Sequence, residues 1–353
     1  MEAEHQRAAN RTITRFLGNE KRLILGHSKR NVHYINRRSL DRATENGNCL
    51  VILNTKKTAL EIYNKLHDRR DDFKVLHLST NMCPAHRIQV IDEMKKDLDA
   101  GKKIICVSTQ LIEAGVDISF SCVVRAMAGL DSIAQSAGRC NRNGESDLEK
   151  NVYAIPIKDE SVDKLPDIKS GKEISKEIIR IFGDRDLLDE EVMNSYYKKY
   201  FDGKSSQLDY PTKDNRHIYT MLANNNSDRI KYANTTGEEF PRFLAQAFQS
   251  ADESFSVIDN KTKPVIVFYG EAEMLVNEYK SIPPGIITKR KFQIIKKLHR
   301  FSVSLYDRAI DELSKSGAIS VMDEELGILL LDEHFYNANT GVSEDVNPEI
   351  FIQ

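Results

Sequence analysis

The sequence predicts an α/β protein with a parallel-sheet domain over residues 1–158, linker helices and loops over 159–238, and a small α+β accessory domain over 239–353. In the first part, short β-branched runs alternate with helical patterns, which is typical of a parallel sheet. A charged stretch with Pro166 and Gly171 then indicates a linker. Mixed helix and strand patterns return after residue 239 and indicate the second, smaller domain.

Apolar periodicity gives the expected elements of the first domain. Helices are predicted over 57–66 and 84–98, because Pro84 suits the first turn of a helix and Gly101 suits the position after its end. Strands are predicted at 23–28, 49–53, 75–78, 104–107, 122–126 and 152–157.

Beyond residue 158 the pattern predicts helices over 174–182 and 187–200, then exposed loops over 203–238. The accessory domain is expected to contain helices over 240–249, 271–279, 289–300 and 306–314, and strands over 255–258, 265–269, 301–305, 319–322 and 327–331.

Polar residues follow the ends of two predicted strands, Ser79 and Thr80 after one, Thr109 and Gln110 after another. Ligands of open parallel sheets collect beyond the carboxyl ends of the strands. Hydroxyl and amide groups there can bond a nucleic-acid backbone without reading bases. For Ser79 and Thr80 the alternative is capping of the helix that begins at Pro84.

A second cluster lies at the end of the strand 122–126. A helix is expected to carry Gln135, Gly138, Arg139 and Arg142, with both arginines on one face. Two guanidinium groups and an amide that point the same way form a phosphate clamp. The alternative is two surface charges on an amphipathic helix.

The runs TQLIEAGVD (109–117) and QSAGRCNR (135–142) resemble motifs V and VI of superfamily 2 helicases, which lie on the second of two RecA-like domains. The GRCNRNGE ending resembles Cas3-type helicase–nucleases of type I CRISPR interference, most of all the I-C branch. LVILNTKKTALEIYNKL resembles motif IV, and LHLSTNMCPAHR the next block, where many relatives carry His in place of Asn81. YGEAEMLV and FYNANTGV resemble the family's accessory domain.

The resemblance implies roles for several candidate residues. Arg139 and Arg142 would act in catalysis by stabilising charge on the γ-phosphoryl group of ATP, a contribution of roughly 10³–10⁵ in rate. It assigns Thr109 and Gln110 to single-stranded DNA and places Asp117 near the ATP ribose. Gly115 allows a sharp reversal next to Asp117, and we assign Gly115 and Gln135 to ATP binding as well. Ser79 and Thr80, at the neighbouring strand end, are assigned to single-stranded DNA. The family's partners are the RNA-guided Cascade complex and an N-terminal half with the nuclease and first RecA-like domain.

The sequence contains no G-x-x-x-x-G-K-[ST] phosphate loop and no D-E-x-H or D-E-A-D box in a RecA-like context. Asp332-Glu333-His334 is predicted to be a surface segment, and His67-Asp68 to be a solvated helix end. ATP with Mg²⁺ would therefore be shared with the N-terminal half. We expect no metal bound by this chain and no ATPase activity from it alone.

Composition limits the remaining possibilities. The formal net charge is -2, yet residues 1–45 hold ten Lys/Arg against five Asp/Glu, either as a phosphate-facing edge or as a solvated start. No apolar run reaches the roughly 18–20 residues of a membrane span. The five cysteines lack a C-x-x-C pair. These features predict reduced, mostly buried thiols and a cytoplasmic protein without a membrane partner.

Two further clusters leave alternatives open. The aromatic residues of 196–201 could stack bases or pack internally, and the basic helix 289–300 could bind DNA or be an ordinary charged face. The sequence thus predicts the helicase C-terminal portion of a Cas3-type enzyme, which contributes motifs IV–VI to ATP-dependent translocation and unwinding. The alternatives are a non-catalytic DNA- or Cascade-binding module, or half of a different superfamily 2 helicase.

Overall fold

The computed structural model describes residues 13–16, 21–25, 47–67, 73–142, 150–157, 160–183, 185–204, 210–242, 245–255, 262–283 and 288–343. The chain divides into two compact units. The first joins residues 1–194 with 262–353, and the second is Ser195–Lys261. Among the described helices, none is both long enough and apolar enough to cross a membrane.

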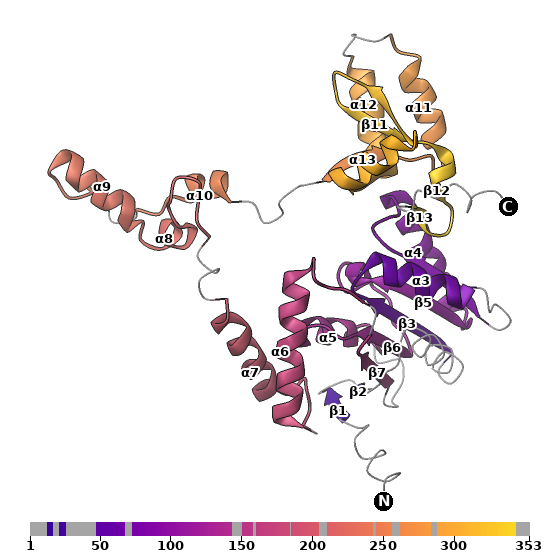
Figure 1. The fold of residues 1–353 in the computed structure, drawn as a ribbon, viewed down its shortest axis with the longest axis horizontal. Helices are drawn as coiled ribbons and strands as arrows, with labels where there is room; N and C mark the ends of the chain where they lie inside the picture. The colour runs from indigo at the N-terminus through magenta and orange to yellow at the C-terminus, as the bar shows by residue number, and fades with distance from the viewer. Residues whose placement is uncertain are drawn as a thin grey trace, which may run out of the picture. The chain divides into compact units, whose positions relative to one another are not determined.

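A seven-stranded sheet forms the centre of the first unit, in the order β1-β2-β7-β6-β3-β5-β4 (Figure 1). Every neighbouring pair is parallel except β1 and β2. The predicted parallel sheet is therefore confirmed. Its strands are β1 (Ile13–Phe16), β2 (Lys21–Leu25), β3 (Asn48–Leu53), β4 (Lys74–Leu78), β5 (Ile104–Thr109), β6 (Cys122–Ala126) and β7 (Lys150–Ile155).

In the described stretches between these strands lie the helices α3 (Lys56–His67), α4 (Pro84–Asp99) and α5 (Leu130–Ala137) and the 3₁₀ turn η1 (Gln110–Ile112). The central strands β3 and β5 are buried along their length, as continuous apolar runs require in a sheet covered on both faces. Helix α3 packs Ala59, Ile62 and Leu66 into this core at helical spacing. All five cysteines are buried thiols outside disulfide bonds, as predicted.

The predicted linker 159–172 is partly wrong, because helix α6 (Pro166–Phe182) begins at Pro166. Proline suits the first helical turn, where its missing N–H is not needed. The buried stripe of α6 contains Gly171, Ser175 and Ile178, and two of these residues are too small or too polar to give an apolar signal. Helix α7 (Glu190–Asp202) follows near its predicted position.

The described residues of the second unit contain the end of α7 and the short helices α8 (Ile218–Ala223), α9 (Asn226–Thr236) and α10 (Phe248–Ser254). The prediction of loops over 203–238 is wrong, because α8 and α9 lie there. Helix α9 was missed because none of its described side chains is buried, so its sequence has no apolar periodicity. The predicted helix 240–249 is displaced to α10. Phe255 is not in a strand, and the rest of the strand predicted at 255–258 lies outside the described residues.

The accessory domain belongs to the first unit and has a four-stranded sheet in the order β10-β11-β8-β9. Its helices predicted over 271–279, 289–300 and 306–314 and its terminal hairpin are confirmed, whereas the one predicted over 240–249 is not. The elements are β8 (Thr262–Ile266), α11 (Ala272–Lys280), α12 (Lys289–Leu298), η3 (His299–Phe301), β9 (Ser302–Tyr306), α13 (Asp307–Lys315), β10 (Ile319–Asp323), β11 (Ile328–Leu331), η4 (Glu333–Phe335), β12 (Tyr336–Asn337) and β13 (Gly341–Val342).

A buried polar cluster fixes α11 and α12 to strand β10. Asp323 Oδ2 accepts a hydrogen bond from the Tyr279 hydroxyl at 2.6 Å and pairs with Lys291 Nζ at 2.9 Å. These two donors lower the pKa of Asp323 to about 2. Burial and the bond to Asp323 raise the pKa of Tyr279 to about 12. The side chain of Lys291 in the predicted basic helix is therefore used internally.

Candidate nucleotide and nucleic-acid site

The stretch from Thr109 to Asp117 leaves the carboxyl end of β5. Thr109 is nearly buried, Gln110 is half-buried and begins η1, and the Glu113 amide donates to Gln110 O at 2.9 Å. Gly115 is exposed and has φ +74°, a left-handed conformation that favours glycine. The reversal expected at this glycine is confirmed. It places Asp117 at the surface, with 74% of its side chain exposed.

The single helix expected to carry both arginines is wrong. Helix α5 ends at Ala137, with Gly138 as its C-cap. Cys140 then forms a parallel bridge with Phe120, and Asn141 has φ +47°. The Phe120 amide donates to Arg139 O at 2.9 Å, and the Asn141 amide donates to Phe120 O at 3.0 Å. The Arg139 and Cys140 amides donate to Ser136 O and Ala137 O at 3.0 Å, three residues back instead of four, so the chain leaves the helix in a tight turn before the arginines.

Arg139 is held against the backbone of the motif V stretch. Only 5% of the residue is exposed. Its Nη2 donates to Glu113 O at 2.5 Å, and its Nη1 donates to Val116 O. Burial, and then the nearby Arg142, lower the pKa of Arg139. The structure therefore gives this arginine a bracing position between the two motifs.

Arg142, in contrast, lies at the surface. Its side chain is 39% exposed, and its Nε lies 2.7 Å from Asp117 Oδ1. The Arg142 amide donates to Ser119 Oγ at 3.0 Å. Gln135 is exposed on α5. The structure thus brings Arg142 and Asp117 together.

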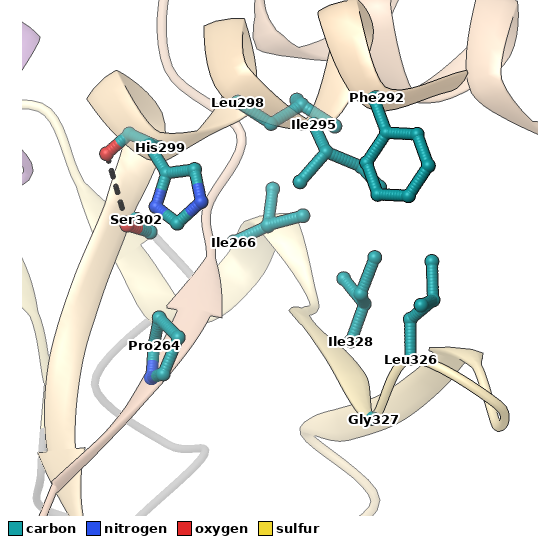
Figure 2. A pocket seen from close by; sticks show the side chains of 10 residues that line it. All are labelled: Pro264, Ile266, Phe292, Ile295, Leu298, His299, Ser302, Leu326, Gly327 and Ile328. Atoms are coloured by element: carbon teal, nitrogen blue, oxygen red, sulfur yellow. Dashed lines mark hydrogen bonds between the residues drawn. The ribbon is translucent and has the colours of Figure 1, made fainter. Parts of the chain in front are cut away.

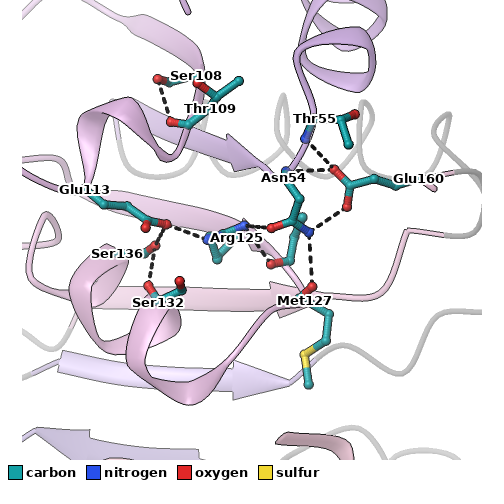
Figure 3. Close-up of polar contacts among 11 residues, drawn as sticks. Asn54, Thr55, Ser108, Thr109, Glu113, Arg125, Met127, Ser132, Ser136 and Glu160 are labelled. Atoms are coloured by element: carbon teal, nitrogen blue, oxygen red, sulfur yellow. Dashed lines mark hydrogen bonds and ion pairs between the residues drawn. The ribbon is translucent and has the colours of Figure 1, made fainter. Parts of the chain in front are cut away.

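A buried network behind these loops escaped the sequence-based prediction. The Arg125 Nε lies 2.7 Å from Glu113 Oε1, and Ser136 Oγ donates to the same oxygen at 2.9 Å (Figure 3). Burial raises the pKa of Glu113, and the positive charge of Arg125 opposes that rise. Glu113 belongs to motif V, and Ser136 lies on the helix of motif VI. The carboxylate therefore ties the two motifs together beneath the surface.

The network continues toward the end of β3. Arg125 Nη1 donates to Asn54 Oδ1 at 2.6 Å, and Asn54 Nδ2 donates to Glu160 Oε2 at 2.7 Å. Asn54 Nδ2 also lies 3.1 Å from Met127 O (Figure 3). A charged residue inside the apolar run Cys122–Ala126 was the signal available in the sequence, because a buried arginine requires partners.

Ser79 and Thr80 follow β4 but differ in exposure. Ser79 is 1% exposed, its Oγ lies 3.1 Å from His77 Nε2, and it accepts from the Asn81 amide at 3.3 Å. Thr80 is exposed. Capping of α4 by either residue is wrong, since the N-cap is Cys83. Thr80 is therefore the accessible member of the predicted pair.

Other features lie away from this edge. An apolar pocket of about 250 Å³ lies in the accessory domain beside α12, with Phe292, Ile295 and Leu326 among its lining residues (Figure 2). Asp332, Glu333 and His334 are exposed, as predicted. His67 ends α3, whereas Asp68 lies outside the described residues. Of the segment 1–45, only the backbones of β1 and β2 are described.

A parallel sheet with the loops 109–117 and 138–142 beyond the carboxyl ends of its strands has the RecA-like fold. Residues 45–145 match the family model described as CRISPR-associated nuclease/helicase Cas3, C-terminal. Residues 45–145 therefore match the C-terminal portion of the Cas3 family, and this stretch is less than a third of the chain.

Two relatives have the description CRISPR-associated nuclease/helicase Cas3. The protein of Methanothermobacter thermautotrophicus is 32% identical over 110 residues, which are 31% of this chain and 13% of that protein. The protein of Haloferax volcanii is 31% identical over 153 residues, which are 37% of this chain and 16% of that protein. The matched stretches are therefore a small part of either relative.

Solved structures support the fold over most of the chain. The crystal structure of T. fusca Cas3 with ATP aligns with a TM-score of 0.55 at 12% identity, covering 90% of this chain and 39% of that one. A CRISPR RNA-guided surveillance complex in a pre-nicking state contains a chain that aligns with a TM-score of 0.53 at 12% identity, covering 89% and 41%. At these identities the likeness establishes the fold.

Proposed function

We propose that the chain belongs to an ATP-driven motor that moves along single-stranded DNA during CRISPR interference of type I, of the I-C branch. In this motor the chain forms one of the two walls of the ATP-binding cleft. The observation that carries the proposal is the exposed pair of Arg142 and Asp117, braced from beneath by Arg139 and Glu113. ATP with Mg²⁺ is the substrate. The phosphate loop and the magnesium carboxylate come from a first RecA-like domain outside these 353 residues.

Each residue of the wall has a distinct part. Arg142 contacts the γ-phosphate and stabilises the charge that develops on it. Gly115, Asp117 and Gln135 bind the rest of the nucleotide, and Arg139 holds motif V in register with motif VI. Positioning and charge neutralisation carry most of phosphoryl transfer, and both need two walls. The chain alone therefore does not hydrolyse ATP.

Single-stranded DNA contacts Thr80 after the end of β4, and Thr109 and Gln110 at the end of β5. Because hydroxyl and amide contacts go to phosphates and sugars, they carry no base information. Thr109→Ala combined with Gln110→Ala should weaken binding equally across DNA sequences. A loss confined to one sequence context would indicate base readout and contradict this role.

Recruitment to an RNA-guided surveillance complex of the Cascade type is supported by the likeness to the chain in the pre-nicking complex. A binding module without catalysis is the alternative.

The deciding experiment mixes the 353-residue chain with a separately produced first RecA-like domain of a Cas3-type protein. ATP hydrolysis should require both parts, single-stranded DNA and Mg²⁺. DNA-stimulated hydrolysis by the chain alone would contradict the proposal. A mixture that binds DNA but never hydrolyses ATP would favour the non-catalytic module.

A further inference from the structure

The β12–β13 hairpin of the accessory domain is bonded to the loop between β4 and α4. The Val342 amide donates to Asn81 O at 2.8 Å, and Asn81 Nδ2 donates to Val342 O at 3.2 Å. The Cys83 amide donates to the Tyr336 hydroxyl at 3.1 Å. These contacts join segments more than 250 residues apart in the sequence. The loop next to Thr80 is therefore held by a different domain.

Asn81 is the junction of this contact. Its Oδ1 accepts from Lys56 Nζ of α3 at 2.7 Å, while its side-chain Nδ2 and its backbone carbonyl oxygen both bond to β13. Asn81 is 9% exposed. Its side chain therefore connects motif IV to the accessory domain, directly after the exposed Thr80.

Gly341 makes the close approach possible. It has φ +82°, and a Cβ at this position would lie 2.2 Å from Asn81 O and 2.7 Å from the Met82 amide nitrogen. No side chain fits at such distances, and the atoms it would meet are backbone. The hairpin therefore reaches the loop only because residue 341 is a glycine.

Side chains of α4 make a second set of contacts with the accessory domain. The rings of His86 on α4 and Tyr269 stack with centroids 4.4 Å apart at 17°. His86 Nδ1 lies 2.9 Å from the Tyr336 hydroxyl, and the Tyr269 hydroxyl donates to Gln89 Oε1 at 2.7 Å. Helix α4 and the loop that precedes it thus meet the accessory domain as one surface.

We propose that the accessory domain sets the conformation of the Thr80–Cys83 loop through this hairpin, and so fixes the position from which Thr80 contacts a single-stranded nucleic-acid backbone. Asn81 and Gly341 are positioning residues. The inference rests on the proposed function for the role of Thr80. The coupling between hairpin and loop stands on the contacts above.

The Met82 amide offers a readout of the loop itself. It donates to Ser79 O at 3.2 Å, a bond inside the loop that involves no atom of the accessory domain. Hydrogen exchange at Met82 therefore reports loop order, whereas exchange at Val342 reports only whether the hairpin is seated.

The test compares Gly341→Ala with Gly327→Ala in the 353-residue chain. Gly327 has φ +63° in the turn between β10 and β11, and a Cβ added there would meet no atom within 4 Å, so this site carries the backbone strain without the clash. Gly341→Ala should accelerate exchange at Met82 at least tenfold. Gly327→Ala should leave that rate within about twofold, by the usual tolerance of an unclashed site.

Single-stranded DNA affinity is measured on the same two proteins and on Thr80→Ala. Gly341→Ala and Thr80→Ala should each weaken binding several-fold, while Gly327→Ala leaves it unchanged. Unchanged exchange at Met82 with faster exchange at Val342 overturns the coupling. Loss of affinity in Thr80→Ala alone overturns the positioning role.

If Thr80→Ala has no effect on affinity, the assignment of DNA to this loop fails instead, and Met82 still decides the coupling. Should circular dichroism show that Gly341→Ala disrupts the accessory domain, Tyr336→Phe replaces it. This change removes only the hydroxyl, which accepts from the Cys83 amide and contacts His86 Nδ1, and the same acceleration at Met82 is expected.

Discussion

Arg142 Nε and Asp117 Oδ1 lie 2.7 Å apart, so the ends of motifs V and VI meet at the surface as an ion pair. Both side chains are substantially exposed, and such pairs contribute at most about 1 kcal/mol. The pair is therefore weak enough to open when a phosphate competes for the guanidinium. In the proposed function, the ion pair orients Arg142 until the first RecA-like domain completes the ATP site.

Arg142→Ala should abolish ATP turnover in the reconstituted two-part enzyme, by roughly 10³-fold or more, because the γ-phosphate loses its stabilising charge. Folding stability and DNA affinity should stay close to those of the parent, since the side chain is exposed. Arg180→Ala, at an exposed arginine of α6, is the matched control and should turn over normally. Turnover within about threefold of the parent would exclude Arg142 as the catalytic arginine.

Arg139→Ala should differ from Arg142→Ala by destabilising the fold. Two carbonyls, Glu113 O and Val116 O, lose their donor, and an unsatisfied buried acceptor costs about 1–3 kcal/mol. Urea unfolding of the chain alone measures this loss without any ATPase assay. Equal stability of the two alanine variants would contradict the bracing position of Arg139.

Glu113 and Arg125 should show strong energetic coupling. Removing either partner leaves a buried charge, which costs about 3–5 kcal/mol, whereas Glu113→Met with Arg125→Met removes both charges and should cost clearly less than the sum. The exposed pair Arg308 and Glu312, 2.9 Å apart, serves as control, with a coupling of about 0.5 kcal/mol or less. Urea unfolding of the four proteins of each cycle gives both values.

Acid should loosen the contact between α4 and the accessory domain. Burial lowers the pKa of His77 to about 4, with a smaller contribution from His86, and burial lowers that of His86 to about 4. Both folded pKa values lie below the unfolded value of about 6.5, so the unfolded chain binds more protons between these limits. The stabilisation is complete above pH 6.5 and is lost as the pH falls toward 4.

Each histidine contributes up to about 1.4 kcal/mol per pH unit inside that window. His86→Gln should reduce the pH dependence of the urea midpoint between pH 6.5 and 4.5. His334→Gln is the control, because its exposed ring pairs with Asp332, which raises its pKa and gives the opposite sign. A slope that His86→Gln leaves unchanged would show that His86 is not neutral in the folded protein.

The sequence by itself determined the parallel sheet, the strand ends that carry Thr109 and Gln110, and the reversal at Gly115. These features depend on local patterns, namely apolar runs, turn residues and glycine conformations, which a single chain segment specifies. The same reasoning found the helices α11, α12 and α13 and the terminal hairpin of the accessory domain. It missed α9, because that helix has no buried face to leave a period in the sequence.

Only the tertiary structure decided how the site is assembled. The helix that resembles motif VI ends at Ala137 in a tight turn, and Arg139 and Asn141 beyond it bond to Phe120, a residue from another segment. Arg139 is buried and bonded to backbone carbonyls, whereas Arg142 is exposed. The sequence pattern alone does not distinguish these two arginines. The close contact between Gly341 and the backbone of Asn81 forms only where the accessory domain packs against the parallel-sheet domain. Such contacts join residues that are far apart in the chain. Local sequence patterns report only on neighbouring residues, so they do not predict these contacts.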